Sequence, residues 1–194
     1  MTAHITADAL RAARHLTGLS QRDVEQRTGV ARKSIVAAET AETAFTSRPT
    51  TLTRLRSFYE AQGVEFLGVI DVATGLAKGM GARWRMPHQL PPTGADGVSA
   101  HLLRTGLAFS AARALLDVKQ SEVSRLASVS EHKLRALENG SATDDVASRR
   151  LRTFYEERGV EFLGWGDVSR GVFYGVGVRW KNRDALDAST TPIP

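Results

Sequence analysis

Hydrophobic positions along the chain follow a helical period first and a strand-like period later, and this succession occurs twice. In the first occurrence, apolar residues recur every three or four positions, which predicts amphipathic helices. The expected helices are a segment that Thr6 or Asp8 caps and that ends near Thr17, followed by 21–28, 31–40 and 51–62. Two short strands are expected after the helices, at 64–67 and 80–85.

The second occurrence repeats the first in sequence as well as in pattern. Residues 55–84 and 151–180 are identical at 18 of 30 aligned positions, and helix-rich stretches upstream of them align more weakly. The matching elements of the second copy are expected at 109–116, 120–128, 131–139, 147–158, 160–163 and 176–181. An internal repeat of this kind predicts two copies of one small module.

Residues that interrupt regular structure set the expected domain boundaries. The segment 87–97, PHQLPPTGADG, is rich in Pro and Gly and is typical of a linker. The expected domains are an N-terminal module at 1–86, the linker at 87–97, a C-terminal module at 98–182 and a disordered tail at 183–194. The 194 residues suffice for two domains of about 80 to 100 residues each.

Turn signals place two helices close together in each module. Gly18 is expected to end the first helix, Ser20 to cap the second, and Gly29 to form the sharp turn into the third. A short helix, a tight turn and a second helix of similar length form a helix-turn-helix arrangement. The segments are LSQRDVEQRTGVARKSIVAAE in the first module and VKQSEVSRLASVSEHKLRALENG in the second.

These segments resemble the lambda-repressor and Cro-like (XRE) family of helix-turn-helix transcriptional regulators, in a tandem duplicated form. The matching positions are Gln21 and Gln120, Val24 and Val123, Gly29-Val30 and Ser128-Val129, Ile35 and Leu134, and Glu39 and Glu138. The later segment, GVEFL followed by G-x-G-x-R-W, is similar to short bacterial members that add a β-hairpin. The resemblance covers about residues 8–84 and 107–180. It implies a mainly α fold with small β-hairpins, namely two tandem helix-turn-helix modules, each of four to five short helices and a short two-stranded segment.

The resemblance also implies which residues meet DNA. The third helix of each module would enter the major groove with its N-terminal residues at base edges, and the second helix would cross the phosphate backbone. In the first module the implied DNA-binding residues are Gln21, Arg22, Ala31, Arg32, Lys33, Ser34 and Ala37. In the second module they are Gln120, Ser121, Ser130, Glu131, His132, Lys133 and Ala136. Two pairs, Arg14 with Glu39 and Arg113 with Glu138, match a structural ion pair of the family rather than a DNA contact.

The two modules differ where they would read bases. Arg and Lys favour guanine, whereas Glu accepts from cytosine, so the two operator halves are expected to differ. Glu25 departs from the family pattern, which has a small residue there, whereas Ser124 fits it. The second module carries the acidic residues Glu131, Asp144 and Asp145 near its reading face. One module is therefore expected to bind DNA weakly or not at all.

Composition narrows the function classes. A net charge of +5 and a pI near 10 permit nucleic-acid binding. The absence of cysteine excludes disulfides and cysteine-ligated zinc, and the five histidines lack metal-ligand spacing. The pairs Gly79-Met80-Gly81 and Gly175-Val176-Gly177 fit strand glycines better than nucleotide loops. No cofactor, small-molecule ligand, signal peptide, membrane span or catalytic constellation is expected, so the prediction is a cytoplasmic, nucleoid-associated protein that is not an enzyme.

The sequence thus predicts a sequence-specific regulator, a repressor of a promoter, whose partner is double-stranded DNA. Two alternatives remain open: an antitoxin or antagonist that reuses the fold to bind a protein, and an architectural or recombination accessory protein. The exposed edge of each hairpin needs a partner or a cover. The two hairpins of one chain are therefore expected to pair or pack as an intrachain pseudo-dimer, and a homodimer is the other arrangement.

Overall fold

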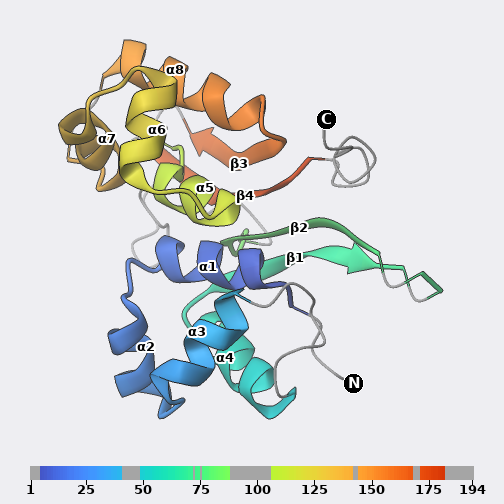
Figure 1. Ribbon diagram of the computed structural model, residues 1–194. Coiled ribbons are helices and arrows are strands. Elements are labelled where there is room, and N and C mark those ends of the chain that lie inside the picture. The colour runs from blue at the N-terminus through green and yellow to red at the C-terminus, as the bar shows by residue number, and fades with distance from the viewer. Residues whose placement is uncertain are drawn as a thin grey trace, which may run out of the picture.

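The computed structural model describes residues 5–40, 49–71, 73–74, 76–87, 106–141, 144–167 and 171–181. Within them each repeat contributes four helices followed by two strands (Figure 1). The first repeat contains α1 (Ala7–Leu16), α2 (Gln21–Thr28), α3 (Arg32–Thr40), α4 (Pro49–Ala61), β1 (Val64–Ile70) and β2 (Ala77–Trp84). The second contains α5 (Phe109–Leu116), α6 (Gln120–Ala127), α7 (Glu131–Glu138), α8 (Asp145–Glu156), β3 (Val160–Asp167) and β4 (Val172–Trp180).

All four strands belong to one antiparallel sheet with the order β1-β2-β4-β3. One row across this sheet runs Phe66, Ala82, Val178, Phe162. The two phenylalanines pack edge-on against Tyr59 of α4 and Tyr155 of α8. Because side chains alternate between the faces of a strand, this row marks the face that the helices cover.

The sheet is continuous because β2 and β4, the inner strands of the two hairpins, pair with each other. Gly81 lies opposite Arg179, and Gly177 lies opposite Arg83. A Cβ atom added to Gly81 would come within 2.5 Å of the Arg179 Cα, and one added to Gly177 would overlap the Arg83 backbone. These two glycines therefore allow the strands of the two repeats to approach one another.

The centre of this pairing is a local two-fold axis. Ala82 and Val178 occupy the same place in the two repeats, and they face each other. The helices α1 and α5 pack together about the same axis (Figure 1). Between them, the Arg11 Nε donates to the Ala114 carbonyl at 2.9 Å, and His15 Nδ1 is 2.8 Å from the Ser110 hydroxyl.

One hydrophobic core spans both repeats and includes Val24, Ile35, Trp84, Val123 and Leu134. The helices and strands of each repeat therefore bury apolar side chains in a core to which the other repeat also contributes. A polar contact also crosses between the repeats, because the Trp180 Nε1 donates to the Asp8 Oδ2 at 2.5 Å. Asp8 lies in the first turn of α1, where a carboxylate is favoured by the helix dipole.

The fold class expected from the sequence is wrong. We expected two mainly α modules with small β-hairpins, and the described residues instead form eight helices and a single four-stranded sheet, a mixed α/β arrangement. The expected strands ended at residues 67 and 163, immediately before Gly68 and Gly164. Both glycines lie at β-bulges, where the strand continues past the irregularity.

Most helix positions agree with the pattern of the sequence. The bounds of α2 and α5 are those predicted, while α4 and α8 begin two residues earlier than expected. Pro49 suits the first position of α4 because its fixed φ is helical and its missing N–H has no partner there anyway. Asp144 caps α8 by accepting from the Ala147 N–H at 2.9 Å. The predicted tail and the linker beyond Pro87 lie outside the described residues.

Candidate nucleic-acid interface

The helix α2 begins at a reciprocal cap that fixes its direction. The Asp23 N–H donates to the Ser20 Oγ at 3.2 Å, and the Ser20 N–H donates to the Asp23 carboxylate at 2.8 Å. The hydrogen bonds from the side chain and backbone of Ser20 lower the pKa of Asp23 below its usual value. The helix ends at Gly29, whose φ of 68° is left-handed. The predicted cap and turn are both confirmed.

The start of α3 gives the Glu25 side chain a structural role. Its Oε1 accepts a hydrogen bond from the Arg32 N–H at 2.9 Å, across the turn between α2 and α3. The carboxylate thereby satisfies one of the first N–H groups of α3, which lack partners within the helix. In the second repeat Ser130 performs this role, because its Oγ accepts from the Lys133 N–H at 3.4 Å. A large residue at position 25 is therefore accommodated by capping rather than by close helix packing.

A buried ion pair holds α3 against α1. The Arg14 Nε donates to the Glu39 Oε1 at 2.7 Å, and the Arg14 Nη2 donates to the Glu39 Oε2 at 2.9 Å. The Glu39 side chain is only 3% exposed. In the second repeat, Arg113 makes the same two-pronged contact with Glu138, at 2.6 and 3.1 Å. Both pairs join the residues that the sequence analysis assigned as structural.

The two glutamines predicted at the phosphate backbone donate hydrogen bonds to the carboxylates of these ion pairs. The Gln21 Nε2 donates to the Glu39 Oε2 at 2.8 Å, and the Gln120 Nε2 donates to the Glu138 Oε2 at 2.7 Å. Each amide therefore braces the first residue of its helix against the buried carboxylate. The contact of these helix ends with phosphate remains a prediction, with the backbone N–H groups of α2 and α6 as its donors.

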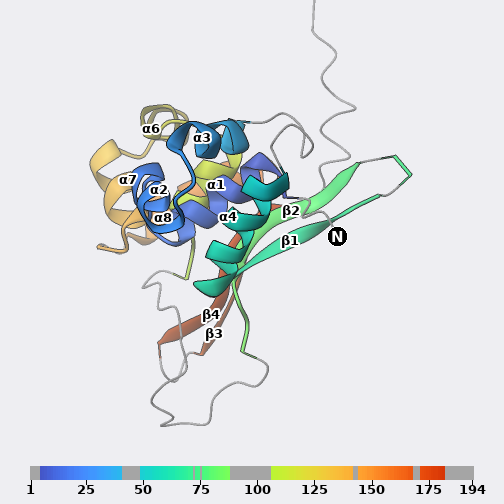
Figure 2. The same cartoon turned by 90° about the horizontal axis from the view of Figure 1, so that it is seen from below.

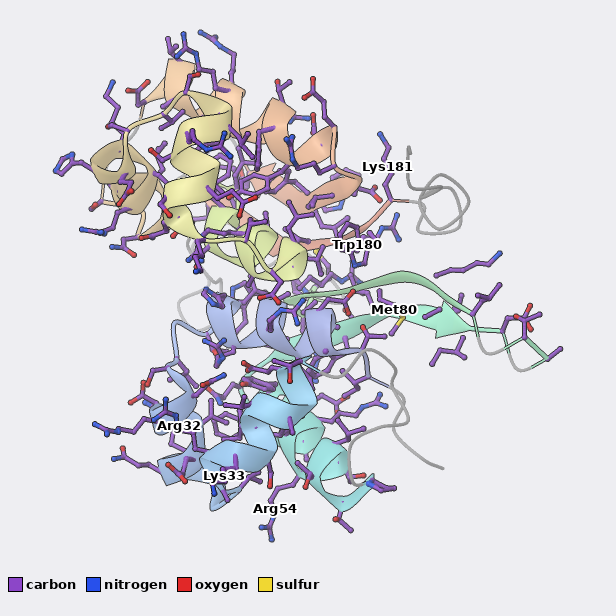
Figure 3. The ribbon with its side chains drawn as sticks, in the orientation of Figure 1. Arg32, Lys33, Arg54, Met80, Trp180 and Lys181 are labelled. Carbon is purple, nitrogen blue, oxygen red and sulfur yellow. The ribbon has the colours of Figure 1, made fainter. Side chains whose placement is uncertain are left out.

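The outer face of α3 is basic and accessible. Ala31, Arg32, Lys33 and Ala37 are exposed and Ser34 is half-buried, whereas Ile35 faces the core. Arg22 of α2 is exposed as well. Among the described residues, the side chains of Arg22, Arg32 and Lys33 make no hydrogen bond or ion pair. Figure 3 shows Arg32 and Lys33 directed away from the body of the first repeat.

The outer face of α7 carries a different set of charges. Ser130, Glu131, His132 and Lys133 are exposed, Ala136 is half-buried, and Ser121 of α6 is exposed nearby in the sequence. The Lys133 ammonium forms an ion pair with Asp144 at 2.8 Å. The Ala147 N–H and then Lys133 lower the pKa of Asp144, so this carboxylate stays charged at neutral pH. Lys133 thus already has a carboxylate partner, although 59% of its side chain is exposed.

The helix-turn-helix segments of the two repeats, α2–α3 and α6–α7, lie toward one side of the molecule. Figures 1 and 2 place α2 and α7 there, while the far end of the β1–β2 hairpin points the other way. The packed helices α1 and α5 and the paired part of the sheet lie between α2 and α7 on one side and the far end of this hairpin on the other. The exposed residues of α3 and α7 are therefore carried on a shared rigid support.

Sequence reasoning missed Arg11, which links this face to the opposite repeat. Its guanidinium donates to the Glu39 carbonyl at the end of α3 and also to the Ala114 and Leu115 carbonyls of α5. It lies 3.7 Å from the Asp117 carboxylate. Arg11 aligns with Ser110 in the second repeat, so the repeat itself gave no signal for this contact.

Comparison with known proteins gave no identification: no protein-family model, curated protein or solved structure matches the chain. Among the described residues, no helix combines the length and apolar composition that crossing a bilayer requires.

Proposed function

We propose that the chain is a sequence-specific DNA-binding transcriptional regulator, a repressor that inserts α3 into the major groove of a promoter operator. The observation that carries this proposal is the pair Arg32 and Lys33. Both are exposed at the N-terminal end of α3, and neither side chain has a hydrogen-bond or ion-pair partner among the described residues. Such residues at the start of a reading helix reach guanine O6 and N7.

Rigid support for α3 favours base reading over loose electrostatic contact. The cap from Glu25, the turn at Gly29 and the buried Arg14–Glu39 pair fix the start, entry and packing of the helix. A reading head that is held in one orientation loses little conformational entropy on binding. Repression would follow from occupying a site that RNA polymerase needs.

The local two-fold axis predicts the form of the operator. Since Ala82 faces Val178 and α1 packs on α5 about one axis, α3 and α7 are related by rotation rather than by translation. Two heads related in this way would read inverted half-sites, with centres about 34–36 Å apart on one face of the duplex. Because Arg32 aligns with Glu131 and Lys33 with His132, the half-sites would be unequal in sequence.

The test is selection of bound duplexes from a random-sequence library, followed by titration of the recovered site. Replacement Arg32→Ala or Lys33→Ala is expected to weaken discrimination at one base pair by about 1–3 kcal/mol. Arg152→Ala is the control, because it removes the same charge from α8, where Arg152 pairs with Glu156 at 2.7 Å. Recovery of no consensus, or equal selectivity in all four proteins, would contradict the proposal.

A second candidate is a protein-binding antagonist that uses the same helices. It is favoured by Glu131 and by the Lys133–Asp144 ion pair, which make the α7 face unsuited to a polyanion. Salt separates the two candidates, because phosphate contacts release counterions and weaken steeply with rising salt. A salt-insensitive complex with a protein, with no affinity for duplex DNA, would favour the antagonist.

A further inference from the structure

The second repeat has a groove that the function proposed above does not use. It lies between the end of α6 and the middle and end of α8, with a volume of about 520 Å³. Its lining includes the exposed Leu126, the buried Phe154 and three arginines, Arg149, Arg150 and Arg158. We call this set the α6–α8 groove.

The arginines of the α6–α8 groove have unused donors. Arg158 stacks on the Phe154 ring, 3.7 Å from its centroid, and donates one N–H to the Phe154 carbonyl. Arg150 donates one N–H to the Ser128 carbonyl at 3.0 Å. Among the described residues, none of the three arginines forms an ion pair with a carboxylate. Each guanidinium has five N–H groups, so most of these donors have no acceptor among the described residues.

The spacing of these groups along α8 defines the complementary ligand. Arg150 and Phe154 are four residues apart on one face of α8, and Arg158, two residues past the end of the helix, turns back onto Phe154. At about 1.5 Å per residue, the Cα atoms of the two arginines are roughly 12 Å apart, and the Arg158 guanidinium lies over the Phe154 ring. Leu126, which is 42% exposed, adds apolar surface at the centre. The groove therefore presents three cations beside the exposed apolar side chain of Leu126.

We propose that the α6–α8 groove docks an acidic amphipathic helix of a partner protein, with carboxylates on either side of an apolar side chain. Charge complementarity selects this occupant, because three cations face only Glu157 among the groove's lining residues. A DNA backbone would satisfy the cations but would leave the exposed side chain of Leu126 without apolar contact. This inference stands independently of DNA binding by α3.

The first repeat provides the matched control, because several of its corresponding positions differ in chemistry. Arg149 and Arg158 align with Thr53 and Gln62, and Leu126 aligns with Arg27. The test variants are therefore Arg149→Thr and Arg158→Gln, which install the residues that the other repeat already has. Arg54→Ala, in the first repeat, is the control for loss of one arginine from the corresponding helix.

The experiment uses the full chain and a fluorescein-labelled helical peptide with a Glu four residues before and four residues after a central Leu. Fluorescence anisotropy is expected to show binding that falls at least tenfold when both Glu are replaced by Gln. Arg149→Thr with Arg158→Gln should lower affinity by a similar factor, while Arg54→Ala leaves it unchanged. Amide chemical-shift changes should cluster on α6 and α8.

Several outcomes would overturn the proposal. They are absence of peptide binding at millimolar concentration, equal binding of the Gln peptide, or shift changes centred on α3 or α7. A random-sequence duplex whose binding falls in the double variant would assign the groove to nucleic acid instead. Thermal unfolding of each variant identifies any loss that comes from misfolding, and single variants that keep the wild-type transition then carry the test.

Discussion

Ala82 lies directly opposite Val178 at the point where β2 pairs with β4, although the two residues occupy the same position in different repeats. A residue that faces its own counterpart marks a two-fold relationship, as in a symmetric dimer interface. Here both sides of that interface belong to one chain. Gly81 and Gly177 flank the Ala82–Val178 pair, and the pairing of β2 with β4 depends on these two glycines.

Gly81→Ala is expected to destabilise the protein by about 1–3 kcal/mol, because the added methyl group overlaps the backbone of β4. Urea unfolding measures this loss. Gly166→Ala is the control in the same sheet, since its Cβ would meet only the Phe173 ring, at 3.1 Å. Equal stability of the two variants would show that close approach of β2 and β4 is not required.

Glu39→Ala is expected to lower the free energy of unfolding by about 3–5 kcal/mol, because the largely buried Arg14 loses its carboxylate. The double variant Arg14→Leu/Glu39→Leu should regain part of this loss, since it leaves no unpaired buried charge. Glu156→Ala is the exposed control: its partner Arg152 is 57% exposed, and the expected change is below about 1 kcal/mol. A similar loss in both glutamate variants would contradict the structural role of Glu39.

His15 should make the protein less stable in acid. Burial, and then the nearby Arg14, Arg113 and Arg11, lower the pKa of His15 from 6.5 to about 3. Between these values the unfolded chain binds a proton that the folded chain does not, so stability falls as pH decreases from about 6.5 toward 3. The slope from this residue is at most about 1.4 kcal/mol per pH unit.

Urea unfolding at pH 7 and pH 5 tests the His15 prediction. His15→Gln removes the titrating ring, and the difference between the two pH values should shrink relative to the wild-type protein. His132→Gln, on the exposed face of α7, is the control and should leave the wild-type difference in place. An unchanged pH dependence in His15→Gln would exclude His15 as its source.

Asp144→Ser separates the two roles of this residue at the α7 face. Serine can still cap α8, so stability should change little, but Lys133 loses its ion-pair partner. If α7 meets DNA, affinity should rise, and the slope of log K against log salt should steepen by about one unit. Asp145→Ser serves as the comparison, because it removes the same charge from a neighbouring residue that does not pair with Lys133. An unaltered salt slope in Asp144→Ser would place α7 away from the phosphate backbone.

Local signals predicted local structure well. Ser20 and Gly29 bracket α2, and their cap and left-handed turn are both present. The same approach shortened the strands, because Gly68 and Gly164 resemble strand ends in sequence although each sits at a bulge. Periodicity describes one segment at a time, so the expectation that the two hairpins pair or pack came from their exposed edges instead, and β2 does pair with β4.

The candidate site shows the same limit. Exposure of Arg32 and Lys33 followed from the helical pattern around Ile35, and the Arg14–Glu39 pair followed from the family resemblance. The contact of Lys133 with Asp144 spans 11 residues and depends on how α7 meets the start of α8. Packing between helices determines such contacts, and neither hydrophobic periodicity nor a local sequence motif predicts them.

Covalent joining of the two halves changes what a single substitution does. In a symmetric homodimer each residue appears on both sides of the axis, so every mutation is made twice. In this chain Arg11 meets Ala114 on one side, while His15 meets Ser110 on the other. Each side can therefore evolve separately. The molecule has the asymmetry of a heterodimer at a fixed one-to-one stoichiometry, and its halves never have to find the correct partner.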